Sequence, residues 1–234
     1  PNIPPMETFC KDCTTNDALL LPRSQEKINA WYAKTPWPVG CNYIPHYAIN
    51  QIEMWQAESF NIDIINKELG WAEGLGFNTI RVFLHHLVWE QDSEGYLSRI
   101  DQFLACAVAH NIKTMFVFFD GVWDPFPKIG TQPVPRHNVH NSGWVQCPGY
   151  QVLHDIDKYD NLMGYVQGIV TRFKQDERVF MWDIFNEPDN MNLCSYKDDN
   201  YSAHKAELSM QLLTKAVKWV RSLQPVQPIT MAPW

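Results

Sequence analysis

The stretch Val179-Phe-Met-Trp-Asp-Ile-Phe-Asn-Glu-Pro188 decides the fold. Its run of mostly apolar residues predicts a strand that is buried on both faces, as in a parallel sheet. Pro188 has no backbone N–H for a sheet ladder, so we expect the strand to end just before it. Asn186 and Glu187 are therefore predicted at the carboxyl end of a buried strand, where parallel α/β folds bind ligands.

The same tripeptide also suits the start of a helix. An acidic residue in the first turn and a proline at the first helical position are common helix-start features. Asn186-Glu187-Pro188 alone does not decide between these two interpretations. The rest of the chain must decide between them.

Composition limits the function classes. The chain has 234 residues and 45% hydrophobic content, enough for one large core in one domain. A net charge of −7 argues against nucleic acid as a partner. No apolar segment approaches the roughly 18 residues that span a bilayer. The chain starts at Pro1 without a visible signal peptide, so we expect a processed, trimmed or partial form.

Strands and helices alternate along the chain after a Pro-rich, extended arm over residues 1–23. This pattern predicts a parallel sheet with helical crossovers in one domain over residues 24–234. The predicted strands cover 39–44, 77–84, 112–119, 179–186 and a fifth from 227, and the predicted helices cover 24–34, 62–75, 96–110, 159–173 and 205–223.

Polar side chains recur where the predicted strands end. They are Asn42 and His46, then His85, then Asp120, and finally Asn186 with Glu187. Because the carboxyl ends of parallel strands share one edge, these groups are expected to converge there. Such convergence is typical of barrel enzymes, and no Gly-rich phosphate loop competes with it.

Arg81 lies inside the second predicted strand. A buried guanidinium needs acceptors, so we expect a carboxylate partner, and a purely structural ion pair is the alternative. Alternation along the strand predicts His85 on the same face as Arg81 and His86 on the other, which argues against a joint metal site. For either histidine, a structural hydrogen bond is the alternative to a substrate contact.

The chain has ten tryptophans, an unusually high number for 234 residues. We expect about half of them to be buried in the core. Exposed tryptophans in loops would instead suit the apolar faces of sugar rings. Trp123 and Trp144 fall in the long segment 122–157, which we expect to overhang the carboxyl end of the sheet. Among the cysteines, Cys41 and Cys106 are predicted to be buried thiols.

Three segments together resemble the clan A glycoside hydrolases, nearest to the cellulase-type family 5. They are Trp182-Asp-Ile-Phe-Asn-Glu-Pro188, Phe77-Asn-Thr-Ile-Arg-Val-Phe83 and Val39-Gly-Cys-Asn-Tyr43, and the resemblance covers residues 36–234. It implies an α/β fold of the (β/α)8 TIM-barrel type, of which this chain covers roughly the first five βα units. It also implies general acid/base catalysis by Glu187, a sugar 2-hydroxyl contact by Asn186, and an Arg81 that steadies the nucleophile.

The implied reaction is retaining hydrolysis, in which a second carboxylate attacks the anomeric carbon about 5–5.5 Å from the first. The family supplies that nucleophile from its seventh strand, and no residue here matches it; Asp120, Asp124 and Asp183 do not fit the pattern. We therefore expect the first part of a longer enzyme, or a barrel completed by a second chain. The isolated chain is expected to hydrolyse little or nothing.

The expected substrate is a β-linked polysaccharide or oligosaccharide, with no cofactor or metal, in a secreted or periplasmic protein. One alternative is a non-catalytic sugar-binding half-barrel that uses Trp55, Trp89, Trp123 and Trp144 as stacking platforms. Another is a lyase or aldolase barrel. That alternative needs a Schiff-base lysine or a metal cluster at the strand ends, and the sequence indicates neither.

Overall fold

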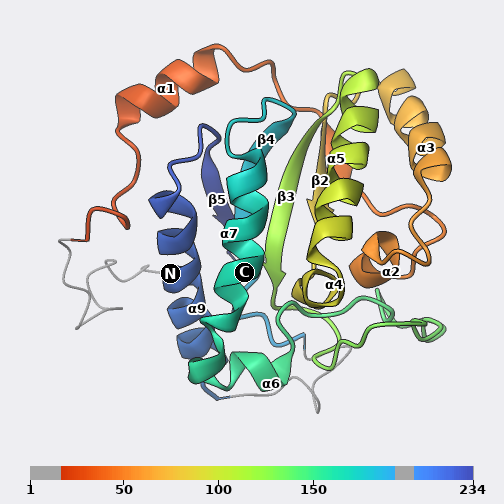
Figure 1. The fold of residues 1–234 in the computed structure, drawn as a ribbon, viewed down its shortest axis with the longest axis vertical. Coiled ribbons are helices and arrows are strands. Elements are labelled where there is room, and N and C mark those ends of the chain that lie inside the picture. The colour runs from red at the N-terminus through yellow and green to blue at the C-terminus, as the bar shows by residue number, and fades with distance from the viewer. Residues whose placement is uncertain (1–16, 193–202, 234) are drawn as a thin grey trace.

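The structure is a computed structural model of the chain, and it describes residues 17–192 and 203–233. Five strands form one parallel sheet in the order of the sequence (Figure 1). They are β1 Gly40–Asn42, β2 Thr79–Phe83, β3 Lys113–Asp120, β4 Val179–Asn186 and β5 Ile229–Ala232. Among the described residues β1 and β5 each have one neighbour, so the sheet is not closed.

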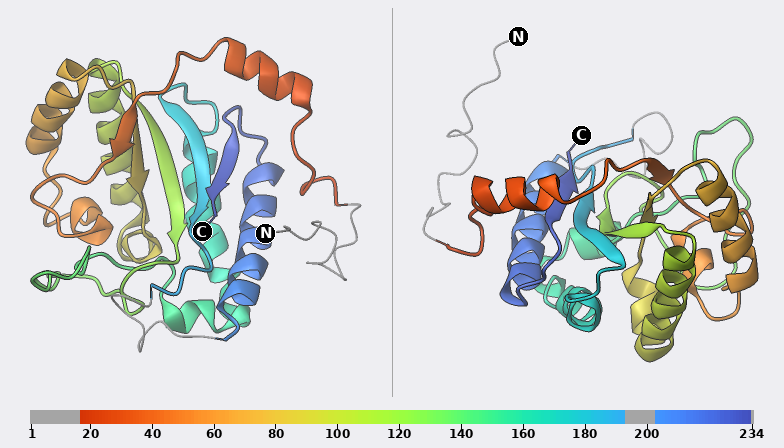
Figure 2. Two further views of the ribbon diagram at one scale, coloured as in Figure 1. Left: turned by 180° about the vertical axis from the view of Figure 1, so that it is seen from behind. Right: turned by 90° about the horizontal axis from the view of Figure 1, so that it is seen from above.

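Helices connect the strands and cover one face of the sheet. Seen from behind, no described helix lies in front of the strands (Figure 2, left). The α-helices are α1 Gln25–Ala33, α2 Gln51–Trp55, α3 Ile62–Gly74, α4 His86–Gln91, α5 Ser93–Ala109, α6 Tyr150–Leu153, α7 Asn161–Phe173 and α9 Lys205–Ser222, with a 3-10 helix, η2, at Ile156–Lys158. The predicted α/β architecture of the barrel type is thus confirmed, as an open sheet.

Aromatic stacking fills the layer between the sheet and the helices. Trp182 of β4 stacks between Phe116 and Phe118 of β3, with ring centroids 6.0 and 5.5 Å apart. Tyr165 of α7 meets Phe118 edge-on and donates its hydroxyl to the Phe118 carbonyl. Phe116 and Phe118 occupy alternate positions of β3 and therefore lie on the same face of the sheet.

The described part of the N-terminal arm is attached to the end of α9. Arg23 donates to the backbone oxygens of Pro225 and Gln227, and Arg221 donates to that of Leu19. The next segment, α1, begins after its N-cap Ser24 and crosses the end of the sheet where the strands start (Figures 1 and 2). The division at residue 23 stays a prediction.

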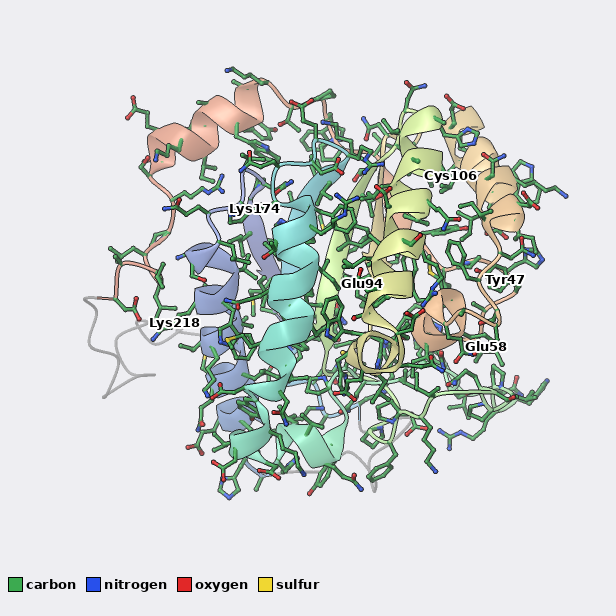
Figure 3. All side chains as sticks on the ribbon, in the orientation of Figure 1. Tyr47, Glu58, Glu94, Cys106, Lys174 and Lys218 are labelled. Atoms are coloured by element: carbon green, nitrogen blue, oxygen red, sulfur yellow. The ribbon has the colours of Figure 1, made fainter. Side chains whose placement is uncertain are left out.

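Two predicted buried thiols are less buried than expected. Cys41 is exposed because β1 is an edge strand with a neighbour on one side only. Cys106 is half-buried on α5, where it faces α3 (Figure 3). No helix in the described part of the chain is long and apolar enough to cross a membrane.

Candidate active site

Arg81 of β2 is the centre of a polar cluster at the carboxyl end of the sheet. Its Nε and Nη2 atoms donate to Oδ2 of Asp183 at 2.9 and 2.7 Å. Nη2 also donates to Oδ1 of Asn186 at 2.9 Å, and Nη1 donates to Oδ1 of Asn42 at 3.1 Å. The expectation of a carboxylate partner is confirmed, and one guanidinium joins the ends of β1, β2 and β4.

Asp183 and Asn186 contact the same guanidinium although they lie three positions apart on β4. In a regular strand, positions 183 and 186 would point to opposite faces. The register between β4 and β5 shifts between these two residues, and such irregularities re-aim side chains. The irregular strand end therefore places both acceptors around Arg81.

Asp120, the last residue of β3, is buried beside Asn186. Its Oδ1 accepts from Nδ2 of Asn186 at 3.3 Å and from the backbone N–H of Val122 at 3.0 Å. Its Oδ2 has no hydrogen-bond partner among the described residues. Burial raises the pKa of Asp120 to about 7, although both hydrogen bonds act in the opposite direction. This carboxyl group is therefore partly protonated at neutral pH.

Glu187 follows β4 in a left-handed backbone conformation, with φ at 45°. This region costs most L-residues about 1–2 kcal/mol, and asparagine tolerates it best after glycine. Of the other five non-glycine residues with positive φ in the described chain, four are asparagines. A glutamate in this conformation is the kind of local strain that gathers at functional sites.

Hydrogen bonds hold Glu187 on both sides. Its backbone N–H donates to the Ala232 carbonyl of β5 at 2.7 Å, and its Oε2 accepts from Nδ2 of Asn190 at 2.7 Å. Its charge also contributes to the raised pKa of Asp120. Residues 188 and 189 form a turn, not the first turn of a helix. The helix-start interpretation of Asn-Glu-Pro is therefore wrong.

The two histidines after β2 do not have the positions that strand alternation predicts. β2 ends at Phe83, and His85 is the N-cap of α4, whose first residue is His86. Both side chains are buried, and their rings are stacked with centroids 4.9 Å apart. The prediction that they point to opposite faces is wrong because the strand ends before them.

His85 has both ring nitrogens engaged inside the protein. Nδ1 accepts from the backbone N–H of Leu87 at 3.2 Å, and Nε2 lies 2.9 Å from the Gln146 carbonyl, to which it donates in the matching tautomer. Burial lowers the pKa of His85 to about 4, so the ring is neutral. The structure thus places His85 in the scaffold and not among the groups that surround Arg81.

Within the described residues, His85, His86 and Cys147 form a group whose potential ligand atoms lie within 4.8 Å of one another. Stacked rings direct their in-plane lone pairs side by side and not toward one point. Burial also raises the pKa of the Cys147 thiol, which opposes the thiolate that a metal ion needs. The group is best described as a buried hydrogen-bonded cluster.

His46 is separated from the other strand-end residues. Its Nδ1 pairs with Oε1 of Glu68 on α3, and the hydroxyl of Tyr43 donates to the other oxygen of Glu68 at 2.8 Å. His46 is therefore directed toward an outer helix. The structure brings together Asn42, Arg81 and Asn186, with Glu187 at the end of the same strand as Asn186.

Trp144 returns from the long segment after β3 to the ends of β1 and β2. It lines a small pocket with Asn42, Tyr43 and Phe83. Its ring centroid lies 6.2 Å from that of Phe83 and 5.1 Å from that of Trp123, which it meets edge-on. Both predicted loop tryptophans are thus partly exposed and adjacent, and one of them borders a residue of the Arg81 cluster.

Trp55 and Trp89 do not lie in loops. Trp55 ends α2, is fully buried and donates its indole N–H to the Phe83 carbonyl at 2.8 Å. Trp89 belongs to α4 and packs closely against Gly168 of α7. The expected role of Trp55 as an exposed stacking platform is therefore wrong, whereas Trp89 is partly exposed and its role stays a prediction.

Two residues near Glu187 were not among the predicted site residues. Asn190, which bonds the Glu187 carboxylate, carries no signal except its position three residues downstream. Lys205 is almost fully buried at the start of α9. Its signal was present in the sequence, because Lys205 lies on the same helical stripe as the buried Ser209 and Leu212.

Comparisons with known proteins support the fold. No protein-family model and no curated protein matches the sequence. Among solved structures, the chain is similar to the β-1,4-mannanase of the sea hare Aplysia kurodai, with a TM-score of 0.57, 14% identity, and coverage of 84% of this chain and 59% of that one. The chain is also similar to GH5_18 from Streptomyces cattleya, with a TM-score of 0.54, 13% identity, and coverage of 84% of this chain and 44% of that one.

A third similar structure is the exo-β-1,4-mannosidase of Opitutaceae bacterium strain TAV5, with a TM-score of 0.55 and 22% identity, covering 84% of this chain and 32% of that one. The chain spans between about a third and three fifths of these three proteins. It therefore has the TIM-barrel fold of these glycoside hydrolases, as an unclosed part of the barrel.

Proposed function

We propose that this chain is part of a retaining glycoside hydrolase, with Glu187 as the general acid and base. The observation that carries the proposal is the left-handed backbone of Glu187 at the carboxyl end of β4, next to the cluster around Arg81. Barrel enzymes place their catalytic groups at this end of the strands. The similarity in fold to β-mannanases agrees with this assignment.

In the proposed reaction, Glu187 protonates the departing sugar oxygen and later removes a proton from water. A second carboxylate, about 5–5.5 Å away, attacks the anomeric carbon. Asp183 does not suit this task because its Oδ2 is engaged by Arg81, and Asp120 is buried. The proposed nucleophile therefore lies outside the described residues, in a further part of the natural protein or in a partner chain.

The proposed substrate is a β-linked oligosaccharide or polysaccharide. Asn186 has one Nδ2 hydrogen left after its bond to Asp120, and this hydrogen is available for a sugar hydroxyl. Trp144 supplies an apolar face beside Asn42. β-Mannans are the first substrates to test because mannanases are among the similar structures. A polymeric substrate of this kind implies a secreted or periplasmic enzyme.

A non-catalytic sugar-binding module is the second candidate, and the adjacent Trp123 and Trp144 favour it. A Schiff-base mechanism would need a free amine at the strand ends. The buried Lys205 does not meet that need, because its Nζ donates to two backbone carbonyls.

The test is turnover of manno- and cello-oligosaccharides and of activated aryl glycosides by the natural protein that carries this sequence. Glu187→Ala should reduce kcat by several orders of magnitude, and external azide should restore part of the activity on the activated substrates. The control Glu58→Ala removes an exposed carboxylate and should leave kcat unchanged. Unchanged kinetics in Glu187→Ala would remove Glu187 from the reaction, whereas sugar binding without turnover would favour the binding module.

A further inference from the structure

Lys205 joins the two loops that leave β3 and β4. Its side chain is buried, with 2% of the residue exposed. Nζ donates to the backbone oxygen of Gly121 at 2.5 Å and to that of Asn190 at 2.6 Å. Gly121 directly follows β3, and Asn190 lies three residues beyond Glu187. One ammonium group from α9 thus binds the main chain of both loops that adjoin the candidate acid Glu187.

This position is unfavourable for a lysine on general grounds. Burial of a charge costs free energy unless hydrogen bonds compensate, and a cation at a helix N-terminus faces the positive end of the helix dipole. Burial lowers the pKa of Lys205 to about 8, while the charges of Asp120 and Asp189 act in the opposite direction. The two carbonyl acceptors supply the compensation, which ties the lysine to these loops.

Asn190 carries the connection from Lys205 to Glu187. Its Nδ2 donates to Oε2 of Glu187 at 2.7 Å, and its backbone N–H donates to the Glu187 carbonyl at 3.1 Å. Ser209, one turn along α9 from Lys205, donates to the Pro188 carbonyl. The first turns of α9 therefore hold the residues that follow Glu187, while Asn190 orients its carboxylate.

Gly121 makes the close approach of the two loops possible. A Cβ atom at this position would lie 2.5 Å from the Glu187 carbonyl oxygen, far inside van der Waals contact. The Gly121 N–H donates to the Asn186 carbonyl at 2.9 Å. The glycine lets both backbones come within reach of one lysine side chain.

We propose that Lys205 is a positioning residue for Glu187, which it orients by fixing the backbone of Asn190 and Gly121. The inference rests on the proposed function, because a fixed carboxylate orientation matters most for proton transfer. Lys205 does not touch the substrate in this proposal. It makes α9 a supporting element of the site.

The test is NMR spectroscopy of the 234-residue chain with the Glu187 carboxyl carbon and the Asn190 side-chain amide labelled, using Glu187→Gln to assign the signals. In Lys205→Met, the Asn190 amide signals should move toward solvent-exposed values, and the Glu187 carbon signal should shift. The control Lys218→Met removes a lysine about 20 Å along the same helix, which pairs with Asp17. Lys218 lies at the outer surface (Figure 3), and the control should change neither signal.

A measurement on the wild type covers the case in which Lys205→Met does not fold. Above neutral pH, the Glu187 carbon signal should show a step near pH 8 as Lys205 loses its proton. The pKa of Asp120, about 7, lies close to that of Lys205, so the titration is repeated in Asp120→Asn. Asp189 faces the lysine from the loop, while His204 and Glu207 on α9 are exposed and pair with each other.

The proposal is overturned if Lys205→Met folds and leaves the Asn190 and Glu187 signals at their wild-type positions. It is also overturned if Asp120→Asn shows no step near pH 8, because a step seen only in the wild type belongs to Asp120. Turnover is not needed for either measurement, so a failed glycosidase assay would refute the proposed function without touching this result. Where turnover is present, Lys205→Met should lower kcat on the order of 100-fold with little change in KM.

Discussion

Asp120 and Asp183 are buried carboxyl groups at the same end of the sheet, but they are compensated differently. Asp183 receives two hydrogen bonds from the guanidinium of Arg81, whereas Asp120 receives bonds from a backbone N–H and a neutral amide. Burial raises the pKa of both groups. Their different partners lead to two different expectations for stability.

Arg81→Met should destabilise the protein by about 3 kcal/mol, because it leaves the carboxylate of Asp183 buried without a counter-charge. The free energy of unfolding in urea at pH 7 measures the loss. The control Lys215→Met breaks the exposed pair with Asp160 and should cost less than about 1 kcal/mol. Asp183→Asn in the Arg81→Met background should restore part of the stability. Equal losses in the two single variants would contradict this expectation.

Asp120→Asn should change how stability depends on pH. The folded pKa of about 7 lies above the ordinary value of 3.8, so the folded state binds more protons than the unfolded state between these values. The free energy of unfolding therefore falls as the pH rises from about 4 to 7, by up to about 4 kcal/mol from this group. Unfolding in urea at pH 4.5 and 7.5 should show a smaller fall in Asp120→Asn than in the wild type.

At the scale of elements, apolar patterning predicted all five strands and the helices that alternate with them. The partner of Arg81 also followed from the sequence, because a buried guanidinium demands an acceptor. The positions of His85 and Trp55 did not follow, since short helices replace the predicted strand end and loop there. Their environment depends on tertiary contacts, which period and propensity do not encode.

The contact between the β3 and β4 loops gives a prediction at this scale. Gly121→Ala should cost about 1–3 kcal/mol, because the added Cβ meets the backbone oxygens of Glu187 and Pro188 at 2.5 and 2.9 Å. Thermal unfolding measures the effect. Gly74→Ala is the control, since a Cβ there meets nothing within 4 Å and alanine favours the helix. A Gly121→Ala variant as stable as the wild type would mean that the loops can separate freely.

At the scale of the whole molecule, β1 and β5 are edge strands in the described sheet. Unpaired edges of this kind promote association with other chains. The 234-residue chain should therefore self-associate at high concentration, and Cys41→Lys should reduce the association because it places a charge on the β1 edge. Sedimentation velocity measures the change. Val134→Lys adds the same charge to an exposed loop residue and should leave association as it was.

Under the proposed function, the left-handed backbone at Glu187 means that folding and proton transfer favour different residues at one position. Glu187→Asn should raise the melting temperature, because asparagine tolerates a φ of 45° better than glutamate does. In a library of all substitutions at this position, selection for soluble yield should enrich asparagine and glycine. If Glu187 is the proposed acid and base, selection for growth on a glycan should return glutamate alone, and the disagreement between the two rankings would measure what the proposed reaction demands of this residue.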